Sequence, residues 1–389
     1  MAPSSESLGS CIIVGGGPGG VHVATTIAKT CGATVDVTIV DRQNYMDWSL
    51  ASPRMLVAPD DIDQYGYCMP LDKVCEFVGL QKGKNKTTFV QAAVTQVGPK
   101  SVTLDNGKTL EADVIVVAIG GQYASGAIWK PTPDLTTRET RIAAFRTLRE
   151  KIANSKHVVV TGAGPSGVEV AGELKAAFPD LQVTMVGSLL PNSPEVLQIR
   201  VKTALEGMGV VVKEGRVDAK EPDSDGTVKT RDGGTTIENV DLILNAAGFT
   251  FKGKDIADDT LQKDVTDRGQ FNCRHTLQLA STDSVFCCGD VLAVPEGYYA
   301  DVKGLQHADM TAETVGKNVV AMLQQKPLAD FAWSKTPINK PMMTALGPKI
   351  AVGYMGLPNF MENFLGRTLK CKDYYMSLKK SGYGKGKTW

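Results

Sequence analysis

Two glycine-rich turns of one pattern restrict what this sequence of 389 residues can fold into. The first turn follows the apolar run Cys11–Val14 and reads G-x-G-x-x-G over Gly15–Gly20. The second follows His157–Thr161 and repeats the pattern over Gly162–Gly167. In such a turn the first glycine permits the bend, the second lets the backbone approach a pyrophosphate, and the third lets helix and strand pack closely. Two copies, each between an apolar strand and a helix, predict two dinucleotide sites.

The segments that follow the two turns differ at one informative position. After the first turn, the strand Val35–Val40 ends at Asp41, where β-α-β units of this kind place a carboxylate on a ribose hydroxyl. After the second turn, the strand Val183–Val186 is followed by Gly187 and Ser188. Neither residue selects a 2′-hydroxyl or a 2′-phosphate, so we expect the second site to accept NADH or NADPH.

Further segments repeat across the chain. Asp113–Gly121 and Asp241–Gly248 are each an apolar strand that enters a glycine turn, and each follows a hairpin-like stretch. A third apolar strand, Ser284–Cys288, opens into Gly289 and Asp290. This duplication predicts an α/β protein with two Rossmann-like dinucleotide-binding domains and a small C-terminal α+β region.

Composition excludes several classes of protein. The 42 basic and 42 acidic residues balance, so we expect no nucleic-acid partner. The eight cysteines include no C-x-x-C pair, and neither a disulfide framework nor a metal-ligand set is expected. The short segment ahead of the first strand, the Ala at position 2 and the lack of an 18-residue apolar run predict a cytoplasmic protein without a signal peptide or a myristoyl group.

The two turns, together with Asp41, Ala118–Gly120, Glu169 and Cys288–Asp290, resemble the pyridine nucleotide-disulfide oxidoreductase superfamily. Within it, the chain is most similar to the apoptosis-inducing-factor-like flavoproteins, which include the ferroptosis-suppressor proteins, with type II NADH dehydrogenases as cousins. The resemblance implies an FAD domain in two pieces, residues 9–122 and 249–328. An NAD(P)H domain, residues 123–248, would lie between them, and residues 329–389 would form a C-terminal domain with a basic tail.

The resemblance also implies which residues bind the cofactors. FAD would contact the first turn, the strand ends and the Gly-Asp motif, and His307 would open the helix under the flavin ring. The FAD set is Gly15, Gly16, Gly17, Pro18, Gly19, Gly20, Asp41, Arg54, Val94, Ala118, Gly120, Gly289, Asp290 and His307. NAD(P)H would bind Gly162, Gly164 and Gly167, with Glu169 as a catalytic residue near the nicotinamide.

Several of these residues also have structural interpretations. Glu169 in a first helical turn is stabilised by the helix dipole without any chemistry. Arg54 and Lys130 either serve the flavin or lie in solvent, and packing is the simpler role for His307. Cys288 fits a core strand.

The chain departs from the family where sulfur chemistry would need residues. The redox C-x-x-x-x-C motif is absent, and no cysteine occurs between positions 76 and 272. A threonine of the usual A-T-G turn is replaced by Ile119. We therefore expect an FAD-dependent enzyme that passes electrons from NAD(P)H through the flavin to a quinone-type acceptor, without a cysteine relay.

Two other functions stay open at this point: a redox-sensing protein that switches partner or oligomer, and a ferredoxin- or rubredoxin-type reductase. The tail 367–389 is basic and carries aromatic residues nearby, so it either docks on anionic lipid or forms a solvated tail or dimer contact. We expect a monomer or a homodimer.

Overall fold

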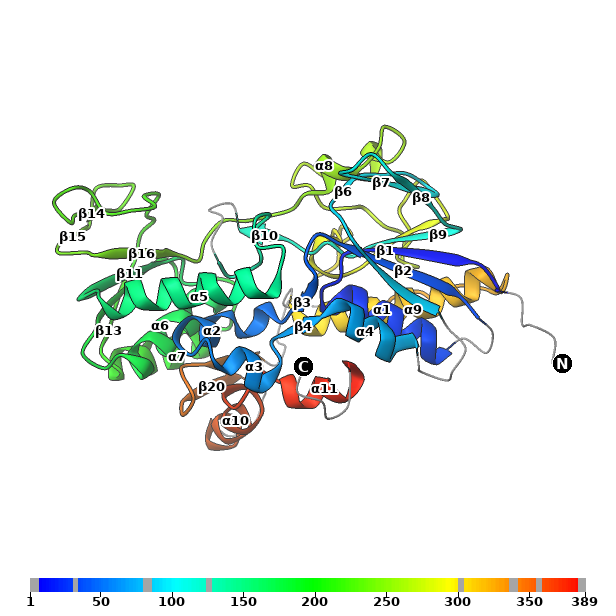
Figure 1. Ribbon diagram of the computed structural model, residues 1–389. Coiled ribbons are helices and arrows are strands. Elements are labelled where there is room, and N and C mark those ends of the chain that lie inside the picture. The colour runs from blue at the N-terminus through cyan, green and yellow to red at the C-terminus, as the bar shows by residue number, and fades with distance from the viewer. Residues whose placement is uncertain are drawn as a thin grey trace.

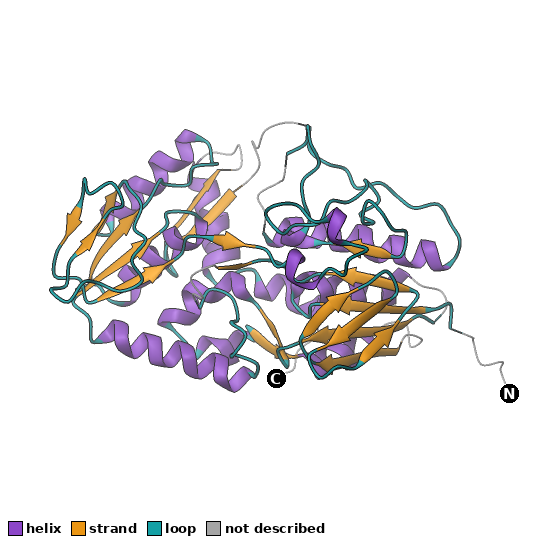
Figure 2. Cartoon of the chain, turned by 90° about the horizontal axis from the view of Figure 1, so that it is seen from above, coloured by secondary structure: helices purple, strands orange, loops and turns teal. Residues whose placement is uncertain are grey.

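The computed structural model describes residues 7–30, 34–79, 86–123, 128–299, 304–335, 342–354 and 359–383. Two lobes lie side by side, and the N-terminal strand belongs to one of them (Figure 1). Each lobe is built on a parallel sheet, and the view from above separates the two groups of strands (Figure 2). The α/β fold with two Rossmann-like sheets that the sequence predicts is confirmed.

The first lobe contains a five-stranded parallel sheet in the order β18-β9-β1-β2-β5. Its strands are β1 (Ser10–Val14), β2 (Asp36–Asp41), β5 (Lys86–Gln91), β9 (Val114–Val117) and β18 (Val285–Cys287). Every residue of β9 is buried, as expected for a central strand covered on both faces. Because β9 and β18 pair although the second lobe lies between them in sequence, this lobe is made from two pieces of chain.

Helices α1 (Pro18–Thr30) and α9 (Leu305–Leu323) lie together below this sheet in the view of Figure 1. They cross closely, because a Cβ added to Gly316 on α9 would lie 2.6 Å from Cβ of Thr26 on α1. The beginnings of both helices point toward the middle of the molecule, next to the first glycine turn. This packing sets where the N-terminus of α9 meets that turn.

The second lobe contains a four-stranded parallel sheet in the order β13-β12-β11-β16. Its strands are β11 (His157–Thr161), β12 (Gln182–Val186), β13 (Val210–Lys213) and β16 (Leu242–Asn245). Its helices are α5 (Arg138–Ala153), α6 (Pro165–Ala177) and α7 (Glu195–Gly207). Val158, Val159 and Val160 on β11 are fully buried.

Shorter elements surround the sheets. In the first half of the chain they are β3 (Tyr45–Asp47), η1 (Ser49–Ala51), α2 (Ser52–Val57), α3 (Asp61–Tyr65), β4 (Cys68–Pro70), α4 (Leu71–Gly79), β6 (Val94–Val97), β7 (Ser101–Leu104) and β8 (Thr109–Glu111). In the second half they are β14 (Val228–Lys229), β15 (Thr236–Ile237), α8 (Gly253–Ile256), η3 (Gln262–Asp264) and η4 (Gly289–Val291). The C-terminal region consists of β19 (Met342–Ala345), β20 (Ala351–Tyr354), α10 (Asn359–Gly366), the π-helix η5 (Arg367–Cys371) and α11 (Met376–Tyr383).

A two-stranded antiparallel ribbon lies where the chain crosses between the lobes. It pairs β10 (Gln122–Tyr123), on the way into the second lobe, with β17 (Phe249–Thr250), on the way out. The C-terminal region packs against the second lobe: a Cβ added to Gly172 on α6 would lie 2.5 Å from Cα of Leu346. It also contacts the first lobe, where Trp48 Nε1 donates to the carbonyl of Tyr374 at 2.9 Å.

In each of the two parallel sheets, an aspartate just before one strand accepts hydrogen bonds from the start of the neighbouring strand. Asp113, just before β9, accepts hydrogen bonds from the Ser10 backbone N–H at 2.8 Å and the Ser10 hydroxyl at 2.9 Å. Asp241, just before β16, accepts from the backbone N–H groups of Lys156 at 2.7 Å and His157 at 2.9 Å. These donors hold the pKa of both carboxyl groups below the ordinary range.

We expect Asp113→Asn and Asp241→Asn each to lower the free energy of unfolding at pH 7 by on the order of 1 kcal/mol, a value reduced for the exposure of both side chains. A carboxyl group with a lowered pKa stabilises the folded state above its unfolded pKa of about 3.9, and this stabilisation is lost as the pH falls. Urea unfolding from pH 7 to pH 3 should therefore show the difference from the unmodified chain shrinking toward zero. A difference that stays constant with pH would contradict this account.

Candidate functional site

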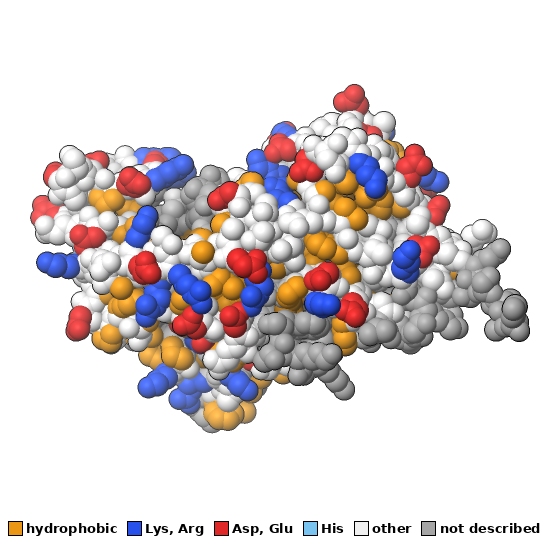
Figure 3. All heavy atoms as spheres, in the orientation of Figure 1, with side chains coloured by type: hydrophobic (Ala, Val, Ile, Leu, Met, Phe, Trp, Pro, Cys, Tyr) orange, Lys and Arg blue, Asp and Glu red, His pale blue; other side chains and the backbone are white. Residues whose placement is uncertain are grey.

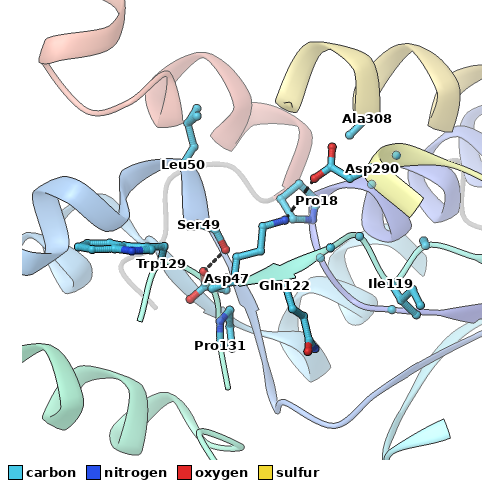
Figure 4. Close-up of a pocket in the computed structure, with 18 of the residues that line it drawn as sticks. Pro18, Asp47, Ser49, Leu50, Ile119, Gln122, Trp129, Pro131, Asp290 and Ala308 are labelled. Carbon is cyan, nitrogen blue, oxygen red and sulfur yellow. Dashed lines mark hydrogen bonds and ion pairs between the residues drawn. The ribbon is translucent and has the colours of Figure 1, made fainter. Parts of the chain in front are cut away.

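A continuous cavity of about 600 Å³ lies between the two lobes, and its wall includes residues of both glycine turns. This volume is within the range of ligand and cofactor pockets. Figure 4 shows that the wall comes from distant parts of the chain: Pro18 opens α1, Ala308 lies on α9, and Asp290 follows β18. Ser49 and Leu50 face them across the cavity.

In the first turn, two glycines have no room for a side chain, whereas the middle glycine does. Gly15 has a φ of +112°, and an added Cβ there would lie 2.6 Å from the Ala118 carbonyl oxygen. A Cβ added to Gly20 would lie only 1.9 Å from the Gly15 carbonyl oxygen. In contrast, no atom lies within 4 Å of a Cβ added to Gly17. The backbone is therefore accessible at the middle glycine, which is where a pyrophosphate needs to approach.

The second turn repeats this geometry. Gly162 has a φ of +88°, and its added Cβ would lie 2.8 Å from Cβ of Ala247. A Cβ added to Gly167 would lie 1.8 Å from the Gly162 carbonyl oxygen, and nothing lies within 4 Å of one added to Gly164. Each turn leads into a helix whose first residue is proline, so the free N–H groups of the first helical turn face the cavity. Both turns fit the phosphates of a dinucleotide.

Asp41 lines the cavity, as does Val94. Its carboxylate accepts from the Gly16 N–H at 2.6 Å and from the Gln43 N–H at 2.9 Å. Burial raises the pKa of Asp41, and these backbone donors oppose the rise. The acid predicted for a ribose therefore lies directly beside the first turn, which is the position that this role requires.

Asp290 lies against a lysine. Lys130 Nζ is 3.3 Å from Asp290 Oδ2, an ion pair that is drawn as a dashed line at Asp290 in Figure 4. The same ammonium lies 5.1 Å from the ring centroid of Phe249. All three residues line the cavity, so Lys130 is not a surface lysine.

A network of hydrogen bonds fixes the segment that carries Lys130. Arg141 Nη1 donates to the Ile128 carbonyl at 2.6 Å, and the Ser52 hydroxyl donates to the Trp129 carbonyl at 2.8 Å. Trp129 Nε1 donates to the Asn245 carbonyl at 2.6 Å, at the end of β16 in the second lobe. The Arg141 side chain is fully buried, and its Nε lies 2.8 Å from Asp47 Oδ2. The segment is therefore tied to both lobes.

Glu169 pairs with a lysine from the C-terminal region. Lys370 Nζ lies 2.5 Å from Glu169 Oε1 and donates to the Met343 carbonyl at 2.7 Å. Glu169 is buried and lies one turn into α6, and both side chains line the cavity. Burial raises the pKa of Glu169, while the charge and hydrogen bond of Lys370 act against this rise. The pair lies at the end of the cavity that belongs to the second turn.

Apart from Arg54 and His307, the predicted site residues form two groups: those that line the cavity and those that lie behind its wall. Gly15, Gly17, Pro18, Gly19, Asp41, Val94, Ala118, Gly120, Gly164, Glu169, Gly289 and Asp290 line the cavity. Gly16, Gly20, Gly162 and Gly167 shape the turns from behind the cavity wall.

The structure places Arg54 and His307 away from the cavity wall. Arg54 Nε lies 2.9 Å from Glu173 Oε2, and its Nη2 donates to the Cys371 carbonyl at 3.0 Å. This buried ion pair ties α2 to α6 and to the C-terminal region, so the geometry does not support the flavin role expected for Arg54. His307 is buried edge-on to Phe331, with 6.3 Å between ring centroids, as in a packing role.

Sequence reasoning missed Lys370 and gave Lys130 no definite role. Neither lysine belongs to a local motif, because each meets its carboxylate only through tertiary contacts. For Lys370 the one signal in the sequence was the basic tail, which places a lysine near the end of the chain without a partner. The π-helix that carries it could not be read from the sequence, although such helices are frequent at functional sites.

Comparison with known proteins identifies the class that this geometry defines. The family model described as pyridine nucleotide-disulphide oxidoreductase matches residues 9–314, and the chain belongs to this family. It is an FAD-dependent oxidoreductase of NAD(P)H, which confirms the two cofactors predicted from the glycine turns.

Among its relatives, the FAD-dependent oxidoreductase FVFD30 of Flammulina velutipes is 28% identical over 343 residues, covering 86% of this chain and 100% of that protein. Type II NADH:quinone oxidoreductase of Haemophilus influenzae is 27% identical over 400 residues, covering 86% of each chain. Ferroptosis suppressor protein 1 of Xenopus tropicalis is 23% identical, covering 94% of this chain and 93% of that protein. The solved structure of NDH2 from Plasmodium falciparum with NADH has a TM-score of 0.71 at 13% identity, covering 97% of this chain and 99% of that one.

Gly17, where an added Cβ meets no atom, and Gly20, where an added Cβ meets a backbone carbonyl, are a matched pair for mutation. In Gly17→Ala the added methyl group meets no protein atom, so we expect the free energy of unfolding to change by less than about 0.5 kcal/mol. The methyl group would occupy the approach of the pyrophosphate, and FAD affinity should fall by about tenfold or more. Gly20→Ala should instead destabilise the fold by roughly 2–4 kcal/mol, because the methyl group meets a backbone carbonyl.

Thermal unfolding of the flavin-free protein and FAD titration would separate the two effects. Unchanged FAD affinity in Gly17→Ala would contradict the assignment of the first turn to the pyrophosphate. An unchanged melting temperature in Gly20→Ala would contradict the close contact between helix and strand.

Proposed function

We propose that this protein passes electrons from NAD(P)H through FAD to a quinone-type acceptor. The observation that carries the proposal is that one cavity is lined by the N-termini of both α1 and α6. Two dinucleotides with their phosphates at these two turns would have their redox-active ends directed toward the same space. The relatives named as quinone oxidoreductases support the choice of acceptor.

A route without a thiol relay is consistent with the cavity wall. Among the described residues that line it, Cys288 is the only cysteine. Burial raises the pKa of this thiol well above its ordinary value, and the neighbouring Cys287 raises it further. A protonated thiol in a core strand is a poor nucleophile. Electrons would therefore pass from the reduced flavin directly to the acceptor.

FAD supplies the redox chemistry when bound, accepting hydride from the nicotinamide and releasing the electrons to the acceptor. The protein's residues orient the two partners and exclude water. Glu169 and Lys370 would hold the nicotinamide end of the site. Lys370 Nζ lies 2.5 Å from Glu169 Oε1 and lines the cavity, so it is a candidate proton donor to an acceptor reduced nearby.

Nucleotide preference would be set at the end of β12. Gly187 has a φ of +151°, and an added Cβ there would lie 2.7 Å from the Ala163 backbone nitrogen. A side chain is therefore excluded at the position where a carboxylate would select NADH, and Ser188 next to it is exposed. We propose that both NADH and NADPH are accepted.

The proposed function is tested by reducing the purified flavoprotein anaerobically with NADH and NADPH in turn. A ubiquinone analogue, oxygen and a one-electron acceptor are then offered separately. Rapid steady-state oxidation of either nucleotide with the quinone supports the proposal. Reduction by both nucleotides followed by slow reoxidation with every acceptor would overturn it and favour a redox-sensing protein.

We expect Glu169→Gln to retain FAD but to lower NAD(P)H turnover by at least about fivefold, because the charge that pairs with Lys370 beside the nicotinamide is lost. The matched control is Glu173→Gln, one turn further along α6. Glu173 is equally buried and pairs with Arg54, but it does not line the cavity. This control should lower the free energy of unfolding by about 3 kcal/mol while leaving turnover per bound flavin unchanged.

Stopped-flow reduction and steady-state assays at pH 7 would measure both variants. Turnover in Glu169→Gln equal to that of the unmodified protein would contradict a catalytic role for Glu169.

We also propose that this is a cytoplasmic protein whose C-terminal region contacts a membrane surface. None of the helices in the described ranges is long and apolar enough to cross a bilayer. Hydrophobic and basic side chains gather over α10 and its surroundings at the lower edge of Figure 3. Phe364 is 58% exposed and Met361 is 41% exposed on α10, and Arg367 and Lys372 are exposed next to them. The part of the basic tail after residue 383 lies outside the described residues.

Replacing Phe364 and Met361 together by serine should reduce co-sedimentation with anionic vesicles by about tenfold, since each large apolar side chain contributes roughly 1.5–3 kcal/mol when buried. The control replaces Val211, which is exposed on β13 of the second lobe and lies outside the C-terminal region, by serine. Equal binding of the two variants would count against this surface.

A further inference from the structure

We propose that Ser49 binds the flavin ring: its hydroxyl oxygen accepts a hydrogen bond from the imide N–H of the isoalloxazine, and Asp47 is the positioning residue that orients this hydroxyl. Ser49 belongs to neither glycine motif. It is the first residue of η1, close after β3. The inference rests on FAD as the cofactor and is independent of the electron acceptor proposed above.

The hydroxyl proton of Ser49 is already used within the protein. Ser49 Oγ lies 2.5 Å from Asp47 Oδ1, and this hydrogen bond is drawn as a dashed line in Figure 4. Because an ionised carboxylate can only accept hydrogen bonds, the serine must be the donor. Among the described residues, Asp47 is the only hydrogen-bond partner of Ser49 Oγ. The lone pairs of this oxygen are therefore left for a donor in the cavity, whose wall includes Ser49.

Arg141 keeps Asp47 in its ionised form. Arg141 Nε donates to Asp47 Oδ2 at 2.8 Å, and its Nη2 donates to Asp47 Oδ1 at 3.3 Å. The guanidinium is fully buried and cannot lose its proton, so a neutral Asp47 would leave it as an unpaired charge in the protein interior. The carboxylate is thus fixed as an acceptor, and with it the direction of the Ser49 hydroxyl.

Ser52, one turn further along the chain, shows the opposite arrangement. Its hydroxyl donates to the Trp129 carbonyl at 2.8 Å, and Arg141 Nη2 donates to its oxygen at 3.5 Å. The side chain is buried, and the protein uses both its donor and its acceptor. Ser49 is partly exposed and uses only its donor. Of these two serines, Ser49 is the one that can accept a hydrogen bond from a ligand.

The chemistry of the cavity restricts which ligand can supply this donor. A quinone offers carbonyl oxygens, which accept hydrogen bonds and cannot donate to Ser49. The redox-active groups that carry an N–H are the imide of the flavin and the carboxamide of the nicotinamide.

The position of Ser49 favours the flavin. Across the cavity Ser49 faces Pro18, which belongs to the first turn, and Asp290 (Figure 4). Next to Ser49, Trp48 Nε1 donates to the Tyr374 carbonyl, so this wall lies against the C-terminal region that brings Lys370 to the cavity. A dinucleotide bound at the first turn would direct its redox-active ring toward this wall, and the imide is the N–H of that ring.

The experiment titrates the flavin-free protein with FAD and with 3-methyl-FAD, in which a methyl group replaces the imide hydrogen, in the absence of any nucleotide or acceptor. We expect Ser49→Ala to weaken FAD binding by about threefold to tenfold, the effect of one lost hydrogen bond. The affinity for 3-methyl-FAD should not fall, so the preference for FAD decreases by the same factor. A structural role would weaken both flavins equally. Ser49→Thr keeps the hydroxyl and should keep the preference.

Asp47→Asn tests the positioning role. The donors of Arg141 would turn the amide oxygen toward the guanidinium and leave the amide nitrogen beside Ser49. That nitrogen donates, so the Ser49 hydroxyl would reverse and direct its proton at the imide N–H. The preference for FAD should then fall at least as far as in Ser49→Ala. Should Asp47→Asn not fold, Ser49→Ala and Ser49→Thr decide the outcome.

The matched control is Ser52→Ala, which removes a neighbouring hydroxyl whose hydrogen bonds stay within the protein. Its ratio of FAD to 3-methyl-FAD affinity should equal that of the unmodified protein. Equal weakening of both flavins in Ser49→Ala would overturn the proposal. Unchanged FAD affinity together with weaker NAD⁺ binding would also overturn it and assign Ser49 to the nicotinamide. Failure of quinone reduction would refute the proposed function alone, because these titrations contain no acceptor.

Discussion

The contact on which this structure depends is between two glycines of one turn. In both lobes, the third glycine of the motif lies so close to the carbonyl oxygen of the first that an added Cβ would come within 1.9 Å or 1.8 Å of that oxygen. Only a residue without a side chain permits this approach, and it brings the start of the helix directly behind the end of the strand. The helix N-terminus is then aimed at the cavity instead of at solvent. Because the contact occurs twice, two anion-binding helix ends face one space.

Two carboxylate–lysine pairs complete the site. In each pair the carboxylate belongs to a local sequence motif, whereas the lysine comes from a distant segment of the chain. The carboxylates, Asp290 and Glu169, are each attached to a glycine-containing motif. The lysines, Lys130 and Lys370, come from the crossing segment and from the C-terminal π-helix. Pairing offsets the cost of removing these charges from water, which would otherwise be several kcal/mol for each ion. The cavity can therefore present charged groups to two cofactors while it remains close to neutral.

The fold was predictable to the extent that it is encoded locally. Strand, glycine turn and helix are adjacent along the chain, so the amino-acid sequence alone is enough to place Gly15, Asp41 and Gly162. Glu169 could be located on its helix, but its partner could not be identified, because Lys370 lies 201 residues further along the chain. The ion pair of Arg54 with Glu173 could not be predicted for the same reason: the sequence context of Arg54 suggested the flavin, whereas tertiary packing brings its guanidinium to Glu173. Residues whose environment is made by long-range contacts carry no periodicity or motif that would reveal the contact.

The ribbon of β10 and β17 brings together the two points at which the second lobe joins the first. Gln122 is paired with Thr250, so the second lobe leaves the first and returns to it at points only about 5 Å apart. The second lobe is inserted into the first lobe in the way that a loop would be, because β9 and β18 pair across the insertion without distortion. A unit with adjoining ends can be inserted into another domain without disturbing that domain's fold. The same property makes the lobe exchangeable, and a counterpart from a relative with another nucleotide preference could be joined at the same two positions.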